Sequence, residues 1–186
     1  MARLLYIANV SLDGYTEDEQ GDFQWTEPAD DVFAFITDLI RPLGTHLLGR
    51  RMYETMAVWE TDPSLAAQSP LMADFANVWR DAEKVVHSMT LTAASTATTR
   101  LESSFEAESV RGMKASATHD MSVGGPNLAA HAFEAGLVDE CQFFVYPLAV
   151  GGGKRALPRH VRIELELLDE RRFSNGVVNL RYRTAR

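Results

Sequence analysis

The chain has 186 residues, of which 46% are hydrophobic and 24% are charged, and its formal net charge is −8. This length suits one sizeable domain with its own core, so we expect a single domain over residues 1–186. The composition excludes a fibrous or disordered chain, and the acidity argues against a broad surface for nucleic acid or acidic membranes. Any bound phosphate must therefore meet a local cluster of basic side chains.

Cysteine and histidine usage excludes the common metal sites. Cys141 is the only cysteine, so no intrachain disulfide can form, and we expect a buried, inert thiol. The five histidines lack the HxxxH and HExxH spacings, and no metal is predicted. The first apolar run ends at Ser11 and Asp13, too early for a signal peptide or membrane span, so a cytoplasmic location is expected.

The first half of the chain predicts alternating strands and helices. Residues 4–10 form an apolar strand, and residues 13–24 form a polar loop that could cover a site. A helix follows, because apolar residues recur at helical spacing from Val32 to Ile40 after cap, proline and acidic signals. A strand at 45–48, a helix at 71–82 and a strand at 84–87 come next.

The second half repeats this alternation and then changes to strands. We predict a helix at 104–117, a strand at 120–123, a helix at 127–136 and a strand at 140–146. Such crossovers predict a largely parallel sheet covered on both faces. The last two runs, 163–173 and 177–183, flank Ser174-Asn175-Gly176, which is typical of a hairpin, so the sheet gains an antiparallel edge.

The segment from Asp120 to Leu128 predicts an anion-binding site. A strand enters Gly124-Gly125, and a helix then opens with Pro126, which suits a first helical turn. Free N–H groups and the helix dipole favour a phosphate at such a point, which makes a nucleotide cofactor the first hypothesis. A plain strand-to-helix turn is the alternative, because short glycine motifs are weak evidence.

A second segment, Leu48-Gly49-Arg50-Arg51, repeats the same strand, glycine and helix-start pattern. Two such turns at the ends of parallel strands could hold the two ends of a dinucleotide. Arginine presents a planar fork suited to phosphate, so either arginine could neutralise the pyrophosphate or an adenosine 2′-phosphate. The alternative is that both are ordinary surface charges. Gly151-Gly-Gly-Lys154 does not complete a P-loop, and we interpret it as a tight glycine loop.

Six short motifs occur in order along nearly the whole chain: Ser11-Leu-Asp-Gly14, Leu48-Gly-Arg50 with Tyr53-Glu54, Gly124-Gly-Pro-Asn-Leu128, Gly136-Leu-Val-Asp-Glu140, Tyr146-Pro147 and Gly151-Gly-Gly153. With these motifs the chain resembles the dihydrofolate reductase superfamily, in particular the branch similar to the C-terminal reductase domain of bacterial riboflavin-biosynthesis enzymes. The resemblance implies a three-layer α/β/α fold with a central, mostly parallel mixed sheet. It also implies NADPH binding and hydride transfer to a C=N or C=O group of a pterin-like or pyrimidine-like substrate.

The resemblance also implies which residues bind the cofactor, in three groups. The phosphate-binding turn is Leu48, Gly49, Arg50 and Arg51. The diphosphate and nicotinamide-ribose segment is Val123, Gly124, Gly125, Pro126, Asn127 and Leu128. Ser88, Met89 and Thr90 take the strand-end position on the adenosine side. Many relatives carry a basic residue at Met89, so NADPH preference rests mainly on the two arginines, and NADH is possible.

On the substrate side, the run from Trp25 to Asp30 is similar to the segment of dihydrofolate reductases that holds the catalytic carboxylate. Asp30 would be that acid, binding the substrate's amino edge and promoting protonation in a dry pocket. Alternatively, Asp30 and Asp31 only complement a helix N-terminus, and Trp25 is a core or lid aromatic. Asp13 either faces the substrate or only caps its turn.

Two departures limit the substrate claim. Riboflavin-pathway reductases commonly have a lysine and a glutamate where this chain has Tyr15 and Val123, and dihydrofolate reductases have a tyrosine at Ala129. We therefore expect a stand-alone NADPH-dependent reductase with an open substrate identity. The alternative is a non-catalytic nucleotide-binding or interaction protein that retains the fold. The resemblance further implies a homodimer.

Overall fold

The computed structural model describes residues 1–185, so Arg186, the last residue of the expected domain, lies outside the described residues. The strands are β1 (Leu4–Ser11), β2 (Tyr15–Glu17), β3 (Leu43–Gly49), β4 (Glu83–His87), β5 (Thr99–Glu102), β6 (Asp120–Gly124), β7 (Glu140–Tyr146), β8 (Lys154–Arg155), β9 (Leu165–Arg172) and β10 (Val178–Thr184). The helices are α1 (Asp30–Ile40), α2 (Arg50–Met56), α3 (Val58–Thr61), α4 (Pro63–Ala66), α5 (Pro70–Asp81), α6 (Ala107–Ser116) and α7 (Pro126–Glu134), with a 3-10 turn, η1, at Gln24–Thr26.

Eight strands form one sheet in the order β5-β4-β3-β6-β1-β7-β10-β9. The first six run parallel, and β10 and β9 add the antiparallel edge. The turn between β9 and β10 contains Gly176 at a φ of 87°, which glycine adopts without strain. This confirms the predicted mixed sheet and its C-terminal hairpin.

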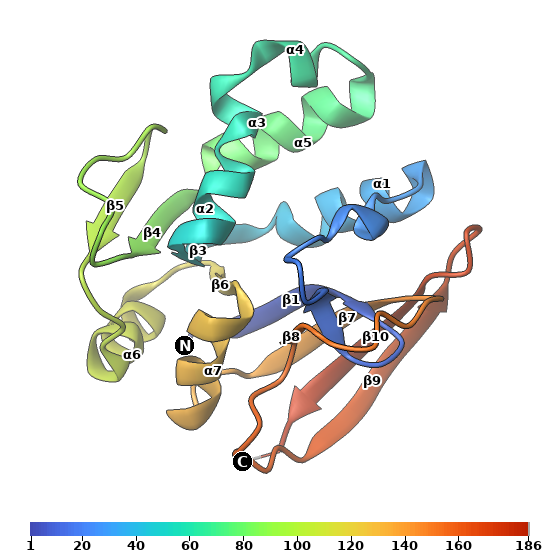
Figure 1. Ribbon diagram of the computed structural model, residues 1–186. Coiled ribbons are helices and arrows are strands. Elements are labelled where there is room, and N and C mark those ends of the chain that lie inside the picture. Colours follow the sequence, from blue (N-terminus) through green and yellow to red (C-terminus); the bar gives the residue numbers. More distant parts are fainter. Residues whose placement is uncertain (186) are drawn as a thin grey trace.

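Helices cover both faces of this sheet, as Figure 1 shows, with α1 to α5 on one side and α6 and α7 on the other. Under α6 and α7 lies a core around Leu47, Val123 and Phe133. Under α1 and α5 lie two further groups of buried side chains, around Trp79 and around Phe144. The chain therefore has the dihydrofolate-reductase-like α/β/α architecture expected from its motifs.

Three short strands were not predicted, and neither were the 3-10 turn η1 and the short helices α3 and α4. The edge strand β5 is a Thr-Arg-Leu-Glu run in a Ser- and Thr-rich segment, and β4 alone supports it. The strands β2 and β8 pair only with each other, inside the two loops that were predicted as polar and glycine-rich. Tertiary pairing rather than local sequence stabilises these strands, which is why periodicity did not predict them.

A row of polar side chains is buried beneath α5, on neighbouring strands. His46 Nδ1 lies 2.6 Å from Ser122 Oγ, and its ring stacks on Trp79 at 5.1 Å between centroids. Lys84, fully buried, pairs with Glu60 at 2.5 Å. Burial, with a smaller contribution from the Lys84 charge, lowers the pKa of His46 to about 4. The imidazole is therefore neutral at pH 7.

Two further observations concern Cys141 and the lengths of the helices. Cys141 is fully buried, and burial raises its pKa to about 12, which confirms the inert thiol. Across residues 1–185, no helix combines the length and the apolar character that a membrane crossing needs.

Candidate functional site

Two glycine turns lie side by side where parallel strands end. β3 and β6 are neighbours, with Leu48 opposite Gly124, and each strand runs directly into a helix. A Cβ placed on Gly125 would come within 4.0 Å of the Gly49 nitrogen. The fold thus brings together the two segments that the sequence singled out.

Gly125 and α7 together form the first half of this edge. Gly125 has a φ of 91°, a backbone conformation that residues with a side chain rarely adopt, and α7 begins at Pro126. The first hydrogen bond of the helix joins the Ala129 nitrogen to the Gly125 oxygen at 3.0 Å. The N–H groups of Asn127 and Leu128 come before this bond and have no acceptor within the helix. These N–H groups and the positive end of the helix dipole attract an anion.

The expected cofactor residues contribute in different ways. Leu48, Val123 and Leu128 have buried side chains in the core, so only their backbone can meet a ligand. Asn127 and Met89 are exposed. Apolar side chains at these three positions are therefore compatible with a motif for a charged ligand.

Arg50 connects α2 with the end of β4. Its guanidinium donates to Glu54 and to Thr90 Oγ1, both at 2.7 Å. Ser88 Oγ accepts from the Thr90 and Leu91 nitrogens and so shapes the turn after β4. The structure therefore brings Arg50, Ser88 and Thr90 together on one side of the glycine turns, as the resemblance implies.

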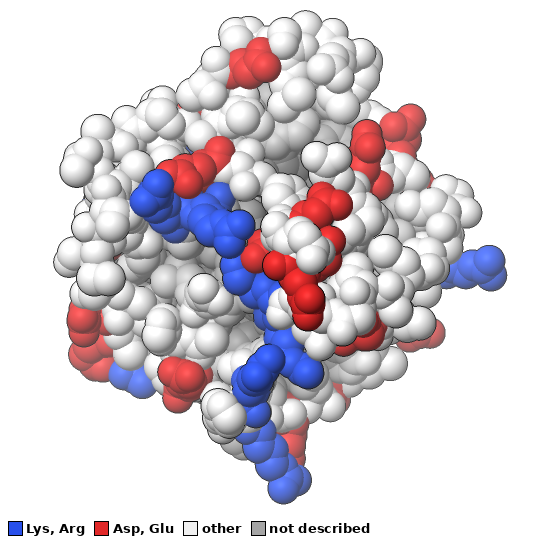
Figure 2. All heavy atoms as spheres, viewed as in Figure 1, with Lys and Arg blue, Asp and Glu red and all other residues white. Residues whose placement is uncertain are grey.

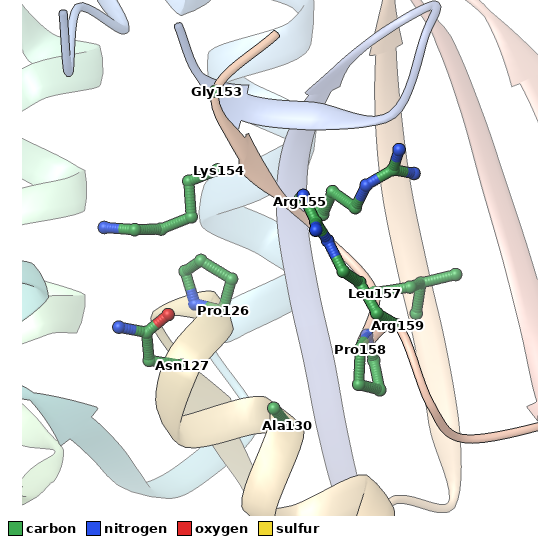
Figure 3. Close-up of a pocket in the computed structure, with 9 residues that line it drawn as sticks. All are labelled: Pro126, Asn127, Ala130, Gly153, Lys154, Arg155, Leu157, Pro158 and Arg159. Carbon is green, nitrogen blue, oxygen red and sulfur yellow. The ribbon is translucent and has the colours of Figure 1, made fainter. Parts of the chain in front are cut away.

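Arg51 and Lys154 meet on the other side through Glu17, whose carboxylate lies 3.3 Å from Arg51 Nη1 and 2.7 Å from Lys154 Nζ. Lys154 also borders a cavity of about 210 Å³ between the start of α7 and the chain after β8. Figure 3 shows Lys154 and Asn127 extending in the same direction from these two elements. Arg155 turns away and lies over the Tyr15 ring at 5.3 Å.

Basic side chains therefore follow one another across this face of the molecule, where Figure 2 shows a continuous blue stripe. The cations that the contacts place here are Arg50, Arg51, Lys154, Arg155 and Arg159. Only the first two were predicted from the sequence. A lysine directly after three glycines is the sequence signal for Lys154, although this segment does not complete a P-loop.

Asp13 caps the neighbouring glycine loop. Its carboxylate accepts from Ser11 Oγ at 2.6 Å, from the Gly151 nitrogen at 2.8 Å and from the Val150 nitrogen at 3.2 Å. These hydrogen bonds, that from Ser11 foremost, lower the pKa of Asp13. Of the two roles considered for Asp13, this geometry favours the cap.

Trp25 and Asp30 lie near the start of α1. The Trp25 ring packs edge-on against Tyr146 at 5.9 Å, and burial raises the pKa of Tyr146 to about 12. Asp30 and Asp31 both stand in the first turn of α1, and Asp31 accepts from the Ser174 nitrogen at 3.0 Å. Asp30 is exposed, which differs from the dry pocket expected for a catalytic carboxylate.

The residues at this edge fit a dinucleotide cofactor. Gly125 takes a positive φ that places the turn beside Gly49, and a Cβ at Gly124 would lie 2.9 Å from the buried Leu48 Cδ2, so the turn has room only for glycine at this point. Arginine, lysine and helix N–H groups are suitable partners for phosphate. Within residues 1–185, no three His, Cys, Asp or Glu side chains gather as a metal site would require.

Comparison with known proteins agrees with this fold. The model of the RibD C-terminal domain family matches residues 3–179, so the chain belongs to the RibD C-terminal domain family. The chain is also 26% identical, over 97% of its length and 94% of the relative, to the uncharacterized protein YyaP of Bacillus subtilis.

Solved structures share the fold at low identity. A putative riboflavin biosynthesis protein from Shewanella sp. PV-4 gives a TM-score of 0.78 at 18% identity, with both chains fully covered. A pyrimidine reductase-like protein from Corynebacterium diphtheriae gives 0.65 at 13%, over the whole of this chain and 92% of that one. The Thermotoga maritima deaminase/reductase gives 0.65 at 15%, and the chain spans 57% of it. Family membership thus supports an oxidoreductase.

Proposed function

We propose that the chain is an NADPH-dependent reductase of the dihydrofolate-reductase type that acts on a small pterin-like or pyrimidine-like molecule. The observation that carries this proposal is the pair of adjacent glycine turns at the carboxyl edge of β3 and β6, flanked by Arg50, Arg51 and Lys154. Ligands of open α/β sheets bind at this edge, and the basic side chains suit a ligand with several phosphates.

In this proposal the start of α7 and Lys154 hold the diphosphate, and Arg50 reads the adenosine end beside Thr90. Because Met89 is an uncharged side chain, Arg50 and Arg51 carry the choice between NADPH and NADH. When bound, the nicotinamide would supply the hydride, while the protein supplies orientation and electrostatics.

The substrate would lie between the glycine turns and the segment from Trp25 to Asp30. Asp30 would bind its amino edge and promote protonation of the ring nitrogen, which requires water to be excluded when the substrate covers the exposed carboxylate. Riboflavin-pathway reductases commonly have a lysine and a glutamate where this chain has Tyr15, whose ring lies under Arg155, and the buried Val123. We therefore propose a substrate class that is broader than that of the riboflavin pathway.

A turnover assay tests this proposal. Purified protein is mixed with NADPH and a panel of pteridine, flavin-precursor and quinonoid acceptors, and loss of reduced nicotinamide absorbance is followed. We expect acceptor-dependent consumption. The exposure of Asp30 favours a second candidate, a nucleotide-binding protein without turnover, and binding of NADPH without consumption by any acceptor would support that candidate instead.

A further inference from the structure

A carboxylate of the chain itself occupies part of the basic stripe. Glu17 ends the short strand β2, its side chain is 17% exposed, and it pairs with cations from two separate elements, Arg51 of α2 and Lys154 of β8. Figure 2 shows acidic side chains adjoining the middle of the stripe. The same Lys154 borders the cavity beside the start of α7.

The segment that follows Glu17, residues 18–22, is a compact turn. Asp18 Oδ1 accepts from the Gln20 and Asp22 nitrogens, both at 2.9 Å, so the turn keeps its shape by its own hydrogen bonds. We call residues 17–22 the acidic strap.

The acidic strap lies directly on the basic segments. A Cβ on Gly21 would meet Arg51 Nη2 at 3.4 Å, and a Cβ on Gly152 would meet Glu19 Oε1 at 2.6 Å. A Cβ on Gly153 would overlap the Glu17 carbonyl oxygen. Only glycine therefore lets the strap approach the chain before Lys154 this closely.

We propose that Glu17 stands in for a ligand phosphate, and that a phosphate-bearing ligand must displace the Glu17 carboxylate from Arg51 and Lys154 in order to bind. This inference rests on the proposed dinucleotide site. A carboxylate and a phosphate offer the same forked oxygen acceptors to arginine and lysine, so one replaces the other at the same cations. The strap thereby lowers the affinity of the site for anions and is released when one binds.

The ion pairs of Glu17 with Arg51 and Lys154 are partly exposed, so each contributes little free energy. The strap therefore adjusts the affinity of the site for anions and does not close it. Pairs of this kind typically change an equilibrium by about two- to threefold each. Removing the Glu17 charge should therefore tighten anion binding by about three- to tenfold.

Calorimetric titration with inorganic pyrophosphate and with NADPH tests the displacement. The variants are Glu17→Gln and, as the matched control, Glu19→Gln, which removes the same charge from an exposed position on the same strap. We expect Glu17→Gln to bind both probes about three- to tenfold more tightly and Glu19→Gln to match the wild type. Adding Lys154→Gln to Glu17→Gln should abolish the gain.

Two other results separate this inference from the proposed function. If the wild type binds NADPH but Glu17→Gln binds it equally or more weakly, Glu17 only positions the cations and the displacement is rejected. If no form binds either probe while thermal unfolding shows each to be folded, the dinucleotide site and the displacement are both rejected.

Discussion

Leu48 and Gly124 face each other across two parallel strands, and the Leu48 side chain already fills the space beside Gly124. A Cβ at 124 would lie 2.9 Å from Leu48 Cδ2 and 3.2 Å from Met52 Cγ. This contact sits directly beneath the two glycine turns. Packing of the core and the shape of the proposed cofactor site therefore depend on the same position.

Replacing Gly124 with alanine should disturb both the packing of the core and the proposed cofactor site. Because the core has no room there, we expect Gly124→Ala to lower the free energy of unfolding by about 1–3 kcal/mol and to weaken NADPH binding. Urea unfolding and a binding titration measure these effects. Gly112→Ala in α6 is the control, since its Cβ would meet nothing within 4 Å and should stabilise the helix by about 0.5–1 kcal/mol. Unchanged stability in Gly124→Ala would mean that the turn adapts freely.

Arg50 should discriminate between the two nicotinamide cofactors. If its guanidinium, beside Thr90, reads the 2′-phosphate, Arg50→Ala will weaken NADPH by about tenfold or more and NADH far less, as expected for a lost charge-assisted contact. Titration of both cofactors gives the comparison. Equal weakening of the two would reject this role and leave Arg50 as a structural link between α2 and β4.

Asp30 should affect chemistry more than binding. We expect Asp30→Asn to leave cofactor affinity nearly intact and to lower kcat/KM by about 10²- to 10⁴-fold, the usual range for a general acid–base group. Asp38→Asn, an exposed change near the other end of α1, is the matched control. If both variants turn over like the wild type, the Asp30 carboxylate only complements the helix N-terminus.

His46 should make the fold sensitive to acid. Its pKa of about 4 in the folded state is below its usual 6.5, so the unfolded chain takes up the proton first as the pH falls. Stability is complete above pH 6.5 and decreases toward pH 4, by about 3 kcal/mol in all. Urea unfolding at pH 7 and pH 5 should show a loss about 2 kcal/mol smaller in His46→Gln than in the wild type. An equal loss in both would place the acid sensitivity elsewhere.

The buried pair Lys84–Glu60 allows a test of the polar row beneath α5. Lys84→Met leaves the Glu60 carboxylate buried without its cation, and we expect a loss of about 3–5 kcal/mol in unfolding free energy. The double variant Lys84→Met/Glu60→Leu should be more stable than Lys84→Met alone. A double variant that is less stable than the single would show that the unpaired Glu60 carboxylate is not the cause of the loss in Lys84→Met.

Sequence patterns predicted the elements whose stability is local or strongly periodic. Strands β1, β3, β6 and β7, helices α1, α5 and α7, and the Asn175-Gly176 hairpin all follow such signals. The strands β2, β5 and β8 have two to four residues each and depend on their partner strands, which for β2 and β8 lie near opposite ends of the chain. Their pairing appears in no local pattern.

The same distinction applies to the site. Gly49, Gly124 and Gly125 were predicted from motifs, because turns at strand ends require particular backbone conformations. Lys154 and Glu17 were not, since their partnership joins segments that are 137 positions apart and arises from the β2–β8 pairing. Charge pairs between loops are set by the fold, and a single sequence does not contain them.

The most direct test of the account is a titration of the purified wild-type protein with NADPH and NADH, followed by nicotinamide fluorescence and by thermal shift. A ligand that binds the native state must raise its apparent stability. We expect both signals with NADPH, and weaker binding of NADH. If the folded protein responds to neither cofactor, the glycine turns and basic side chains at the edge of β3 and β6 do not form a dinucleotide site, and the reductase assignment is wrong.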